Sequence, residues 1–191
     1  MNFKDKYYYQ VKFDKLISEK EIIGGVEFED CEFVNCSFVE TKFIKCKFIT
    51  CRYIGCVLSA TTPTDSHFVE TSFSNSKVIG MDWTKAQRLQ DISFDNCQIN
   101  YSNFRLLKLQ KIKIINCEAK ETDFTEADLS EGNFTNTDFE KSLFLNTNLS
   151  KANFLNAKNY YIDVRCNNIK KAHFSTPEAI SLLDSLNIVL D

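Results

Sequence analysis

The sequence predicts an all-β solenoid, in which the chain turns a corner every five residues and stacks coil upon coil. Three observations lead to this prediction. A bulky apolar residue recurs every five positions over most of the 191 residues, a small residue lies two positions before most of these, and the remaining positions are mostly polar. A short period sustained over so much of a chain is typical of repeat architectures.

The bulky residues keep one phase through the first third of the chain. They are Ile23, Phe28, Phe33, Phe38, Phe43, Phe48, Tyr53 and Leu58. The phase resumes at Phe68, slips by one residue after Trp83, and then runs from Leu89 to Phe154 with Ala119 as its one weak member. The small residues two positions earlier include Cys31, Cys36, Cys46, Cys51, Cys56, Cys97 and Cys117.

A period of five residues fits neither a flat β-strand nor an α-helix. Residues five apart point to opposite faces of a flat strand, and on an α-helix they spiral around the axis. The bulky and the small residue both stay inside only if each five-residue segment is one side of a coil, with a corner between sides. Successive coils can then pair their backbones at about 4.8 Å, as neighbouring strands do.

The residues alone leave the number of sides per coil open. Four sides would give a 20-residue coil and would stack Cys31 on Cys51, Cys36 on Cys56 and Cys97 on Cys117. These coincidences agree with a square coil without proving one.

Five segments in the second half resemble the pentapeptide-repeat family, whose motif is A(D/N)LXX. They are ADLSE (127–131), GNFTN (132–136), TDFEK (137–141), TNLSK (147–151) and ANFLN (152–156). The resemblance covers residues 22–157 and implies a right-handed quadrilateral β-helix with about 20 residues per coil. The first half keeps the size pattern but places Cys at the small position and charged residues around the bulky one.

We expect a single domain, 1–191, whose solenoid spans 22–157 with two interruptions. Residues 59–67 (SATTPTDSH) place Pro63 at a core position, which predicts a loop that bulges from one corner. Residues 84–88 hold the one-residue slip, which predicts a local bulge between two stacks of coils. The weakly alternating segment YYYQVKF predicts an N-terminal capping strand within residues 1–21.

Residues 158–191 predict an irregular coil, a helix and a short terminal strand. Ser175 and Glu178 have capping-box spacing, and Pro177 suits a first turn. Because a solenoid must close its ends, we expect the helix to cap the last coil. The tail also resembles the C-terminal element through which several Qnr-type family members pair, which implies a homodimer. The dimer residues would be Leu182, Leu183, Leu186, Ile188, Val189 and Leu190.

The eight cysteines are best explained as packing residues. Structural zinc sites favour Cys pairs two to four residues apart with a second pair or histidines. Here the spacing is C-x₄-C or longer, and the only histidines are His67 and His173, both expected to face solvent. Buried free Cys behaves as a small hydrophobe, and Cys166, outside the repeats, is expected to be the most exposed.

The sequence contains few of the motifs that catalytic sites use. It has no Gly-rich phosphate loop and no G-x-S-x-G elbow. We therefore expect no enzyme, no catalytic residue, no metal and no cofactor. The net charge of −3 calls for no nucleic-acid or membrane partner, and no apolar stretch has the length of a signal peptide or a membrane span. We expect a soluble cytoplasmic protein.

Charge is unevenly distributed along the chain. Residues 118–141 carry eight acids against two lysines, mostly at outward positions, whereas Arg105, Lys108, Lys111 and Lys113 form a basic block just upstream. A solvated surface that keeps the stack soluble would explain these charges without any partner.

Qnr-type and MfpA-like members of the family are held to mimic a DNA duplex and to protect type II topoisomerases from quinolones. The resemblance implies a protein partner, DNA gyrase or topoisomerase IV, bound through carboxylates that imitate phosphates. The candidate phosphate surrogates are Glu118, Glu121, Asp123, Glu126, Asp128 and Glu131, and the candidate contact loop is Thr61, Thr62, Pro63, Thr64 and Asp65. The alternative is a structural or adaptor scaffold for another protein, which the mild net charge and the basic block favour.

Overall fold

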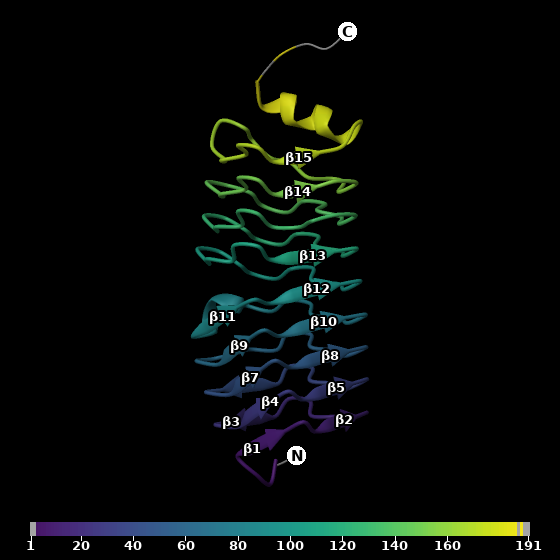
Figure 1. Cartoon of the computed structure of the whole chain (residues 1–191), viewed down its shortest axis with the longest axis vertical. Coiled ribbons are helices and arrows are strands. Elements are labelled where there is room, and N and C mark those ends of the chain that lie inside the picture. The colour runs from purple at the N-terminus through teal and green to yellow at the C-terminus, as the bar shows by residue number, and fades with distance from the viewer. Residues whose placement is uncertain (1–2, 187, 189–191) are drawn as a thin grey trace.

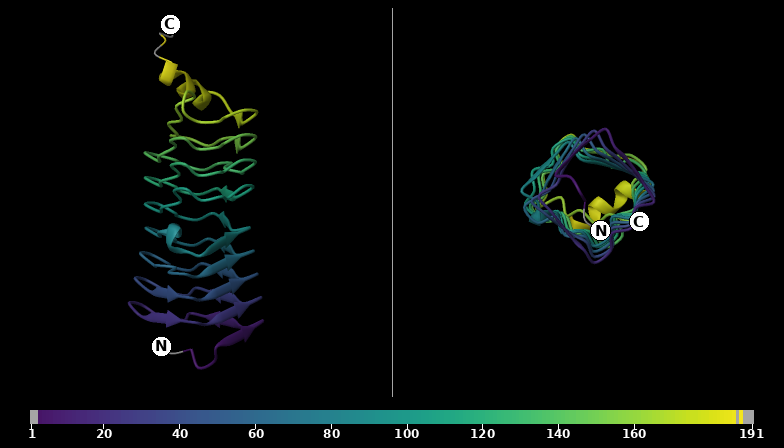
Figure 2. Two further views of the ribbon diagram at one scale, coloured as in Figure 1. Left: turned by 90° about the vertical axis from the view of Figure 1, so that its left-hand side faces the viewer. Right: turned by 90° about the horizontal axis from the view of Figure 1, so that it is seen from below.

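The chain forms a right-handed, four-sided β-helix (Figure 1), and the view along its axis shows the four corners of the coil (Figure 2). The computed structural model describes residues 3–186 and residue 188. Neighbouring coils pair in parallel with a register of 20 residues, so that Phe28 lies opposite Phe48 and Phe33 opposite Tyr53. The predicted all-β quadrilateral solenoid is confirmed.

Each coil contributes one segment to each of four faces. The first face contains β1 (Tyr7–Tyr9), β4 (Glu27–Glu29), β7 (Lys47–Ile49), β9 (His67–Val69) and β11 (Arg88–Gln90). The second contains β2 (Lys12–Asp14), β5 (Glu32–Val34), β8 (Arg52–Ile54), β10 (Ser72–Ser74), β12 (Ser93–Asp95), β13 (Lys113–Ile115), β14 (Asn153–Phe154) and β15 (His173–Phe174).

The other two faces are held mostly by single bridges between coils. The third face runs from Ile17 through Ser37 to Gln98, Glu118, Asp138 and Lys158. The fourth face begins with β3 (Ile22–Gly24) and β6 (Lys42–Ile44) and continues through Asp82, Asn103, Asp123 and Leu143.

Every regular corner is made by a residue in the left-handed region, two positions after the bulky core residue. The φ values lie between 50° and 67°, and most of these residues are not glycine. The N–H group of most corner residues donates to a backbone carbonyl of the next coil, as from Lys15 to Val34 and from Glu126 to Leu145. Hydrogen bonds between coils thus replace the glycines and prolines that turns usually need.

The interior consists of aromatic columns lined by small polar residues. On the second face the rings of Phe33, Tyr53 and Phe73 stack with centroids 4.6 and 4.9 Å apart. Beside them, small side chains donate to carbonyls of the preceding coil, as from Cys46 Sγ to Ile23 O at 3.2 Å and from Thr147 Oγ1 to Phe124 O at 2.9 Å. The side chain at the small position therefore has two roles, because it fits beside the bulky residue and its hydroxyl or thiol also forms a hydrogen bond between coils.

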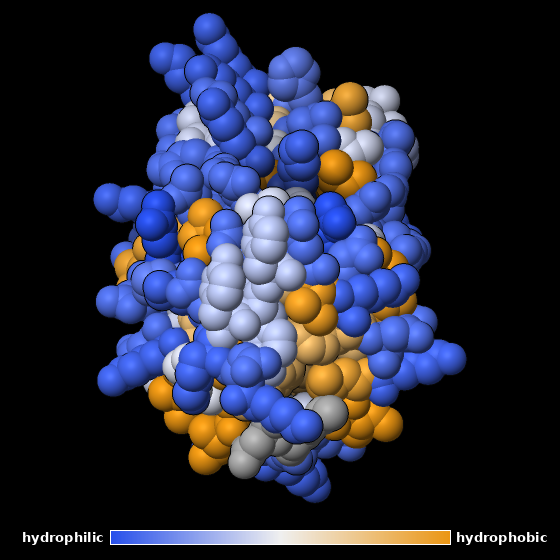
Figure 3. Space-filling view, turned by 60° about the horizontal axis from the view of Figure 1, so that its bottom comes forward, coloured by the Kyte–Doolittle hydropathy of each residue, from blue (hydrophilic) through white to orange (hydrophobic). Residues whose placement is uncertain are grey.

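The solenoid begins earlier than predicted. Residues 7–14 are not a separate capping strand, because β1 and β2 are sides of a regular first coil and pair in parallel with β4 and β5. Phe3 covers the interior of this coil, with its ring packed edge-on against Phe13 and Phe28. Apolar residues gather on this end of the molecule, which comes forward in Figure 3 and includes the exposed Ile17 and Ile22.

Residues 59–67 do not bulge from the stack, so the predicted loop is wrong. Thr62 pairs with Lys42, and Ala60 and Asp65 adopt the usual left-handed corners. Pro63 is buried at the core position. A proline fits there because this position needs no N–H group. In a regular coil the N–H of residue 63 would donate to the carbonyl of Asp82, but that carbonyl accepts from the Lys85 N–H instead.

At residues 84–88 the chain contains one extra residue, and the stack continues across it. Residues Trp83–Lys85 form the 3-10 turn η1, and the register then becomes 21 residues, with His67 opposite Arg88. On the first face β11 is the last strand of its sheet. A cleft of about 160 Å³, floored by Leu89, Leu109 and Ile112, opens between β11 and the following coil.

The C-terminal helix is present and lies across the last coil (Figures 1 and 2). It is the 3-10 helix η2 (Glu178–Leu186). The predicted capping box does not form, because Ser175 Oγ and Glu178 Oε1 accept from the N–H groups of Asn156 and Asn159 in the preceding coil. These contacts join the helix to the stack. The predicted terminal strand lies largely outside the described residues.

The coils also continue beyond residue 157, because β15 pairs with β14 and Asn168 pairs with Asn148. None of the helices in the described part of the chain has the length and apolar character needed to cross a membrane.

Candidate partner-binding surface

The six candidate phosphate surrogates do not form a column on one face. They belong to a single coil and wind around three of its sides, because each five-residue step turns a corner. Glu118 lies on the third face, Asp123 on the fourth and Asp128 on the first, and Glu121, Glu126 and Glu131 occupy the corners that follow.

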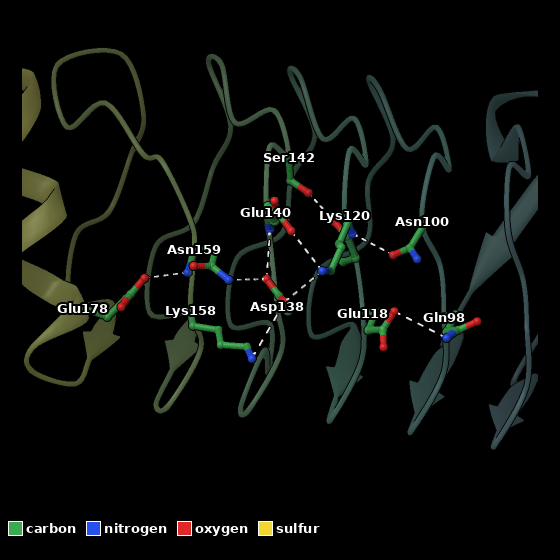
Figure 4. Close-up of polar contacts among 11 residues, drawn as sticks. Gln98, Asn100, Glu118, Lys120, Asp138, Glu140, Ser142, Lys158, Asn159 and Glu178 are labelled. Carbon is green, nitrogen blue, oxygen red and sulfur yellow. Dashed lines mark hydrogen bonds and ion pairs between the residues drawn. The ribbon is translucent and has the colours of Figure 1, made fainter.

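On the third face, acids and bases form a polar ladder around Asp138 (Figure 4). Asn159 Nδ2 donates to Asp138 Oδ1 at 2.8 Å, and the Nζ atoms of Lys120 and Lys158 lie 3.6 and 3.8 Å from Oδ2. Lys120 also donates to Glu140 Oε2 at 2.9 Å. Partial burial acts to raise the pKa of Asp138, but Asn159 and the two lysines hold it below its ordinary value.

The ladder extends in both directions along the rod. Gln98 Nε2 donates to Glu118 Oε2 at 3.4 Å, and Glu178 of η2 accepts from Asn159 N–H. Glu118 is exposed, and its carboxylate is held only by this long hydrogen bond to a neutral amide.

Three more of the candidate acids are also held by neighbouring coils. Asp123 accepts from Thr125 N–H at 2.9 Å and lies 3.7 Å from Arg105. Asp128 accepts from Gln110 at 2.5 Å and from Asn148 at 2.8 Å. Glu131 is bonded at 3.0 Å to Lys151, which lowers its pKa, and lies 4.0 Å from Lys111.

The basic block lies one coil below the acidic coil. This stacking explains the contacts of Arg105 and Lys111, and it recurs earlier in the chain, where Lys47 pairs with Glu27 and Arg52 with Glu32. Sequence reasoning missed these pairs. Their signal is an opposite charge about 20 residues away, which becomes visible only when the coil length is known.

Two candidate acids remain unpartnered. Glu121 and Glu126 are exposed, and neither makes a side-chain hydrogen bond or an ion pair within residues 3–186. They occupy the two corners that bound one segment of the fourth face. Among the six candidate acids, the two without a partner therefore both border the fourth face.

The predicted contact segment 61–65 lies on the same face. Thr61 and Pro63 are buried, and Thr61 Oγ1 donates to Phe38 O at 2.7 Å, so neither can serve as a projecting contact. Asp65 is exposed at the corner that Glu126 occupies three coils further on. Only the outward residues Thr62, Thr64 and Asp65 can contribute to a surface.

The cysteines lie where the packing interpretation places them. Seven are buried, and Cys166 is the one that is half-buried. Burial raises the pKa of Cys51 to about 12, so that thiol is held in its unreactive protonated form. Outside the core, His67 contacts Gln87 at 2.9 Å, and His173 is exposed.

Solved structures with the same fold include two of QnrB1, described as a plasmid-mediated fluoroquinolone resistance protein. A trypsin-treated variant matches with a TM-score of 0.57 and 17% identity, covering 97% of this chain and 98% of the other. The full-length protein matches at 0.53 and 16%, covering 95% and 100%. HetL, from the cyanobacterium Nostoc sp. strain PCC 7120 and involved in heterocyst differentiation regulation, is similar at 0.47 and 10%, covering 88% and 87%.

A search of curated proteins finds no match to the sequence. Family models do match it. The model described as a pentapeptide repeat region matches residues 26–104 and 47–124, and the model of eight pentapeptide repeats matches residues 133–158. Together they cover most of the solenoid, with its five-residue period and its four-sided coil. The chain belongs to the pentapeptide-repeat family.

Proposed function

We propose that this protein is a non-enzymatic, protein-binding solenoid, and that its target is DNA gyrase or topoisomerase IV, which it protects from quinolones by occupying a DNA-binding groove. The observation that carries the proposal is the pair of unpartnered carboxylates, Glu121 and Glu126, at the corners of the fourth face. Such a protein would work in the cytoplasm.

The physical basis is electrostatic. A groove that binds DNA is lined with Lys and Arg, and the affinity for the duplex comes largely from phosphate contacts. Carboxylates fixed on a rigid rod can enter the same groove and experience the same attraction. The similarity to QnrB1 over nearly its whole length supports a rod of suitable size.

The test measures supercoiling by purified gyrase in the presence of ciprofloxacin while this protein is titrated in. We expect the wild-type protein to restore supercoiling and the Glu121→Gln/Glu126→Gln variant to lose that effect. The matched control is Asp128→Asn/Glu131→Gln, which removes two charges that are already paired within the rod. Absence of rescue by the wild-type protein at every concentration would refute the gyrase proposal.

The second candidate function is an adaptor scaffold for a different protein. It is favoured by the hydrogen bonds and ion pairs that hold Asp123, Asp128 and Glu131 within the rod, which leave a weaker acidic surface than the sequence suggests. In that case the gyrase assay stays negative, and the free surface of the fourth face still binds a protein partner.

We further propose that two copies pair through η2. An apolar groove of about 460 Å³ lies along this helix and includes Val164, Ile169, Leu183 and Leu186. Leu182, Leu183 and Leu186 all line the groove, Leu182 also packs against the core, and Ile188 is exposed. Val189 and Leu190 lie outside the described residues.

A further inference from the structure

The fourth face carries most of the apolar side chains that are exposed along the second half of the rod. Between residues 100 and 158, the large exposed apolar residues are Tyr101, Leu106, Leu143, Leu145 and Leu155. Leu155 lies on the second face, and the other four lie on the fourth face or at its corners. Gathered apolar side chains on one face of a water-exposed rod mark an interaction surface.

The register places these residues around the two unpartnered acids. Tyr101 and Leu106 occupy the two corners of one coil, Glu121 and Glu126 occupy the same corners of the next, and Leu143 and Leu145 lie on the following coil. We call these six residues the fourth-face patch. At about 4.8 Å per coil its three coils span about 10 Å along the rod.

Core packing does not explain the two central leucines. Leu143 is 55% exposed and Leu145 is 49% exposed, and both flank the buried Phe144 at outward positions. One coil earlier, the same two positions hold Asp123 and Thr125. The two leucines therefore present apolar surface outward at positions that are polar in the three preceding coils.

The charges around the leucines determine what kind of surface can cover them. Arg105 and Asp123 face each other across the middle of the patch and neutralise one another. Glu126 is unpaired at one margin. Glu121 is unpaired at the other, where the exposed Lys141 follows it one coil later without an ion pair. The excess of negative charge is thus greatest along the Glu126 margin.

We propose that the fourth-face patch binds a basic amphipathic helix of a protein partner, with its apolar stripe on Leu143 and Leu145 and its Lys or Arg residues opposite Glu126 and Glu121. A helix about 10–12 Å across matches the height of the patch, and an apolar stripe flanked by cations complements it in chemistry. Nucleic acid and anionic lipid are repelled by the same two carboxylates. The proposal deepens the proposed protein-binding function but does not depend on gyrase as the partner.

The test uses the full chain and a fluorescent synthetic helix of about 18 residues, with Leu on one face and Lys on both margins. Fluorescence anisotropy gives the affinity, and ¹H–¹⁵N spectra give the location of the contact. We expect binding to the wild-type protein with shifts confined to residues 101–146 of the fourth face. Leu143→Ser/Leu145→Ser should weaken binding at least about tenfold, as removal of central apolar contacts does. Glu126→Gln should weaken it more than Glu121→Gln.

The matched control is Leu155→Ser/Glu70→Gln, which removes an exposed leucine and an exposed glutamate on other faces and should leave the affinity unchanged. The proposal is overturned if the wild-type protein does not bind, if a peptide of the same composition in shuffled order binds equally well, or if the patch variants bind as the wild type does. It is also overturned if Leu143→Ser/Leu145→Ser reduces the mass in light scattering, because the occupant is then a second copy of the chain.

The gyrase assay separates this proposal from the broader one. Protection that survives Leu143→Ser/Leu145→Ser but not Glu121→Gln/Glu126→Gln supports gyrase binding and overturns the helix contact. Peptide binding without any protection supports the helix contact and refutes gyrase as the target.

Discussion

Corner residues show how much backbone strain this fold tolerates at the scale of single residues. An L-residue in the left-handed region costs roughly 1–2 kcal/mol, and Asn and Asp suffer less than others. Asn occupies several corners of the second face, including Asn75, Asn96, Asn116 and Asn136. Thr50 is an exception, because it is β-branched and still has a φ of 53°.

Thr50→Asn should therefore stabilise the protein. We expect the free energy of unfolding to rise by about 1 kcal/mol, because Asn relieves the strain of a branched side chain at this φ. Urea denaturation followed by circular dichroism measures the change. Thr64→Asn is the control, since Thr64 is an outward residue that is not in the left-handed region, and it should shift the free energy by less than about 0.5 kcal/mol. Equal effects at both positions would show that corner strain is not the cause.

At the scale of elements, an Asp or Asn directly before the bulky residue favours a turn. Where it is Asp or Asn, its side chain accepts from the N–H two residues later, as in Asp123 to Thr125 and Asn133 to Thr135. Such sides form turns rather than three-residue strands. Some sides that begin with Glu, Lys or Arg, such as β4 and β8, are extended strands, whereas those that begin with Lys77, Lys108 and Glu118 form turns. The Asp or Asn of the repeat motif is thus a backbone-bonding residue.

Asp138 combines this role with the third-face ladder, and its effect on stability should depend on pH. Because the folded state lowers its pKa, its contribution is present above the ordinary Asp value of about 4 and is lost as pH falls through the lower folded value. We expect Asp138→Asn to reduce the free energy of unfolding by about 1–3 kcal/mol at pH 7, and by progressively less from pH 4 to pH 2.

Urea denaturation across this pH range tests the expectation, with Glu121→Gln as a control that removes an unpaired carboxylate. A deficit in Asp138→Asn that is the same at every pH would mean that the charge of Asp138 does not contribute.

At the scale of the whole molecule, stacking cancels much of the surface charge. Lys20 pairs with Glu40, Lys120 with Glu140 and Lys151 with Glu131, each from coil to coil. Exposed pairs of this kind add little stability individually, but they remove most of the acidic coil from the set of groups that a partner can meet. The fourth face keeps two unpaired carboxylates, Glu121 and Glu126, beside the exposed Leu143 and Leu145.

The end of the rod should determine its oligomeric state. We expect the wild-type protein to have a two-chain mass in light scattering and Leu183→Glu to have a one-chain mass, because a carboxylate in the apolar groove of η2 would be buried without a partner. Ile17→Glu, at an exposed position of the first coil, should leave the mass unchanged. A one-chain mass for the wild-type protein would refute the dimer.

The sequence by itself determined the five-residue period, the inward positions from Ile23 to Phe154 and the presence of a C-terminal helix. These depend on which side chains are apolar or small, and that information is local. The sequence misjudged Pro63. The missing N–H of a proline is tolerated or not according to whether the facing carbonyl, that of Asp82 in the next coil, finds another donor. It also misjudged the first coil, whose strands are fixed by parallel pairing with β4 and β5.

The candidate surface was decided by the tertiary structure alone. Six acids within fourteen residues look like one cluster in the sequence, yet each corner rotates the next acid to another face. Whether an acid is paired depends on a residue about 20 positions away, as for Glu131 and Lys151. Only the stacked coils bring these partners together, and they leave Glu121 and Glu126 unpaired beside Leu143 and Leu145.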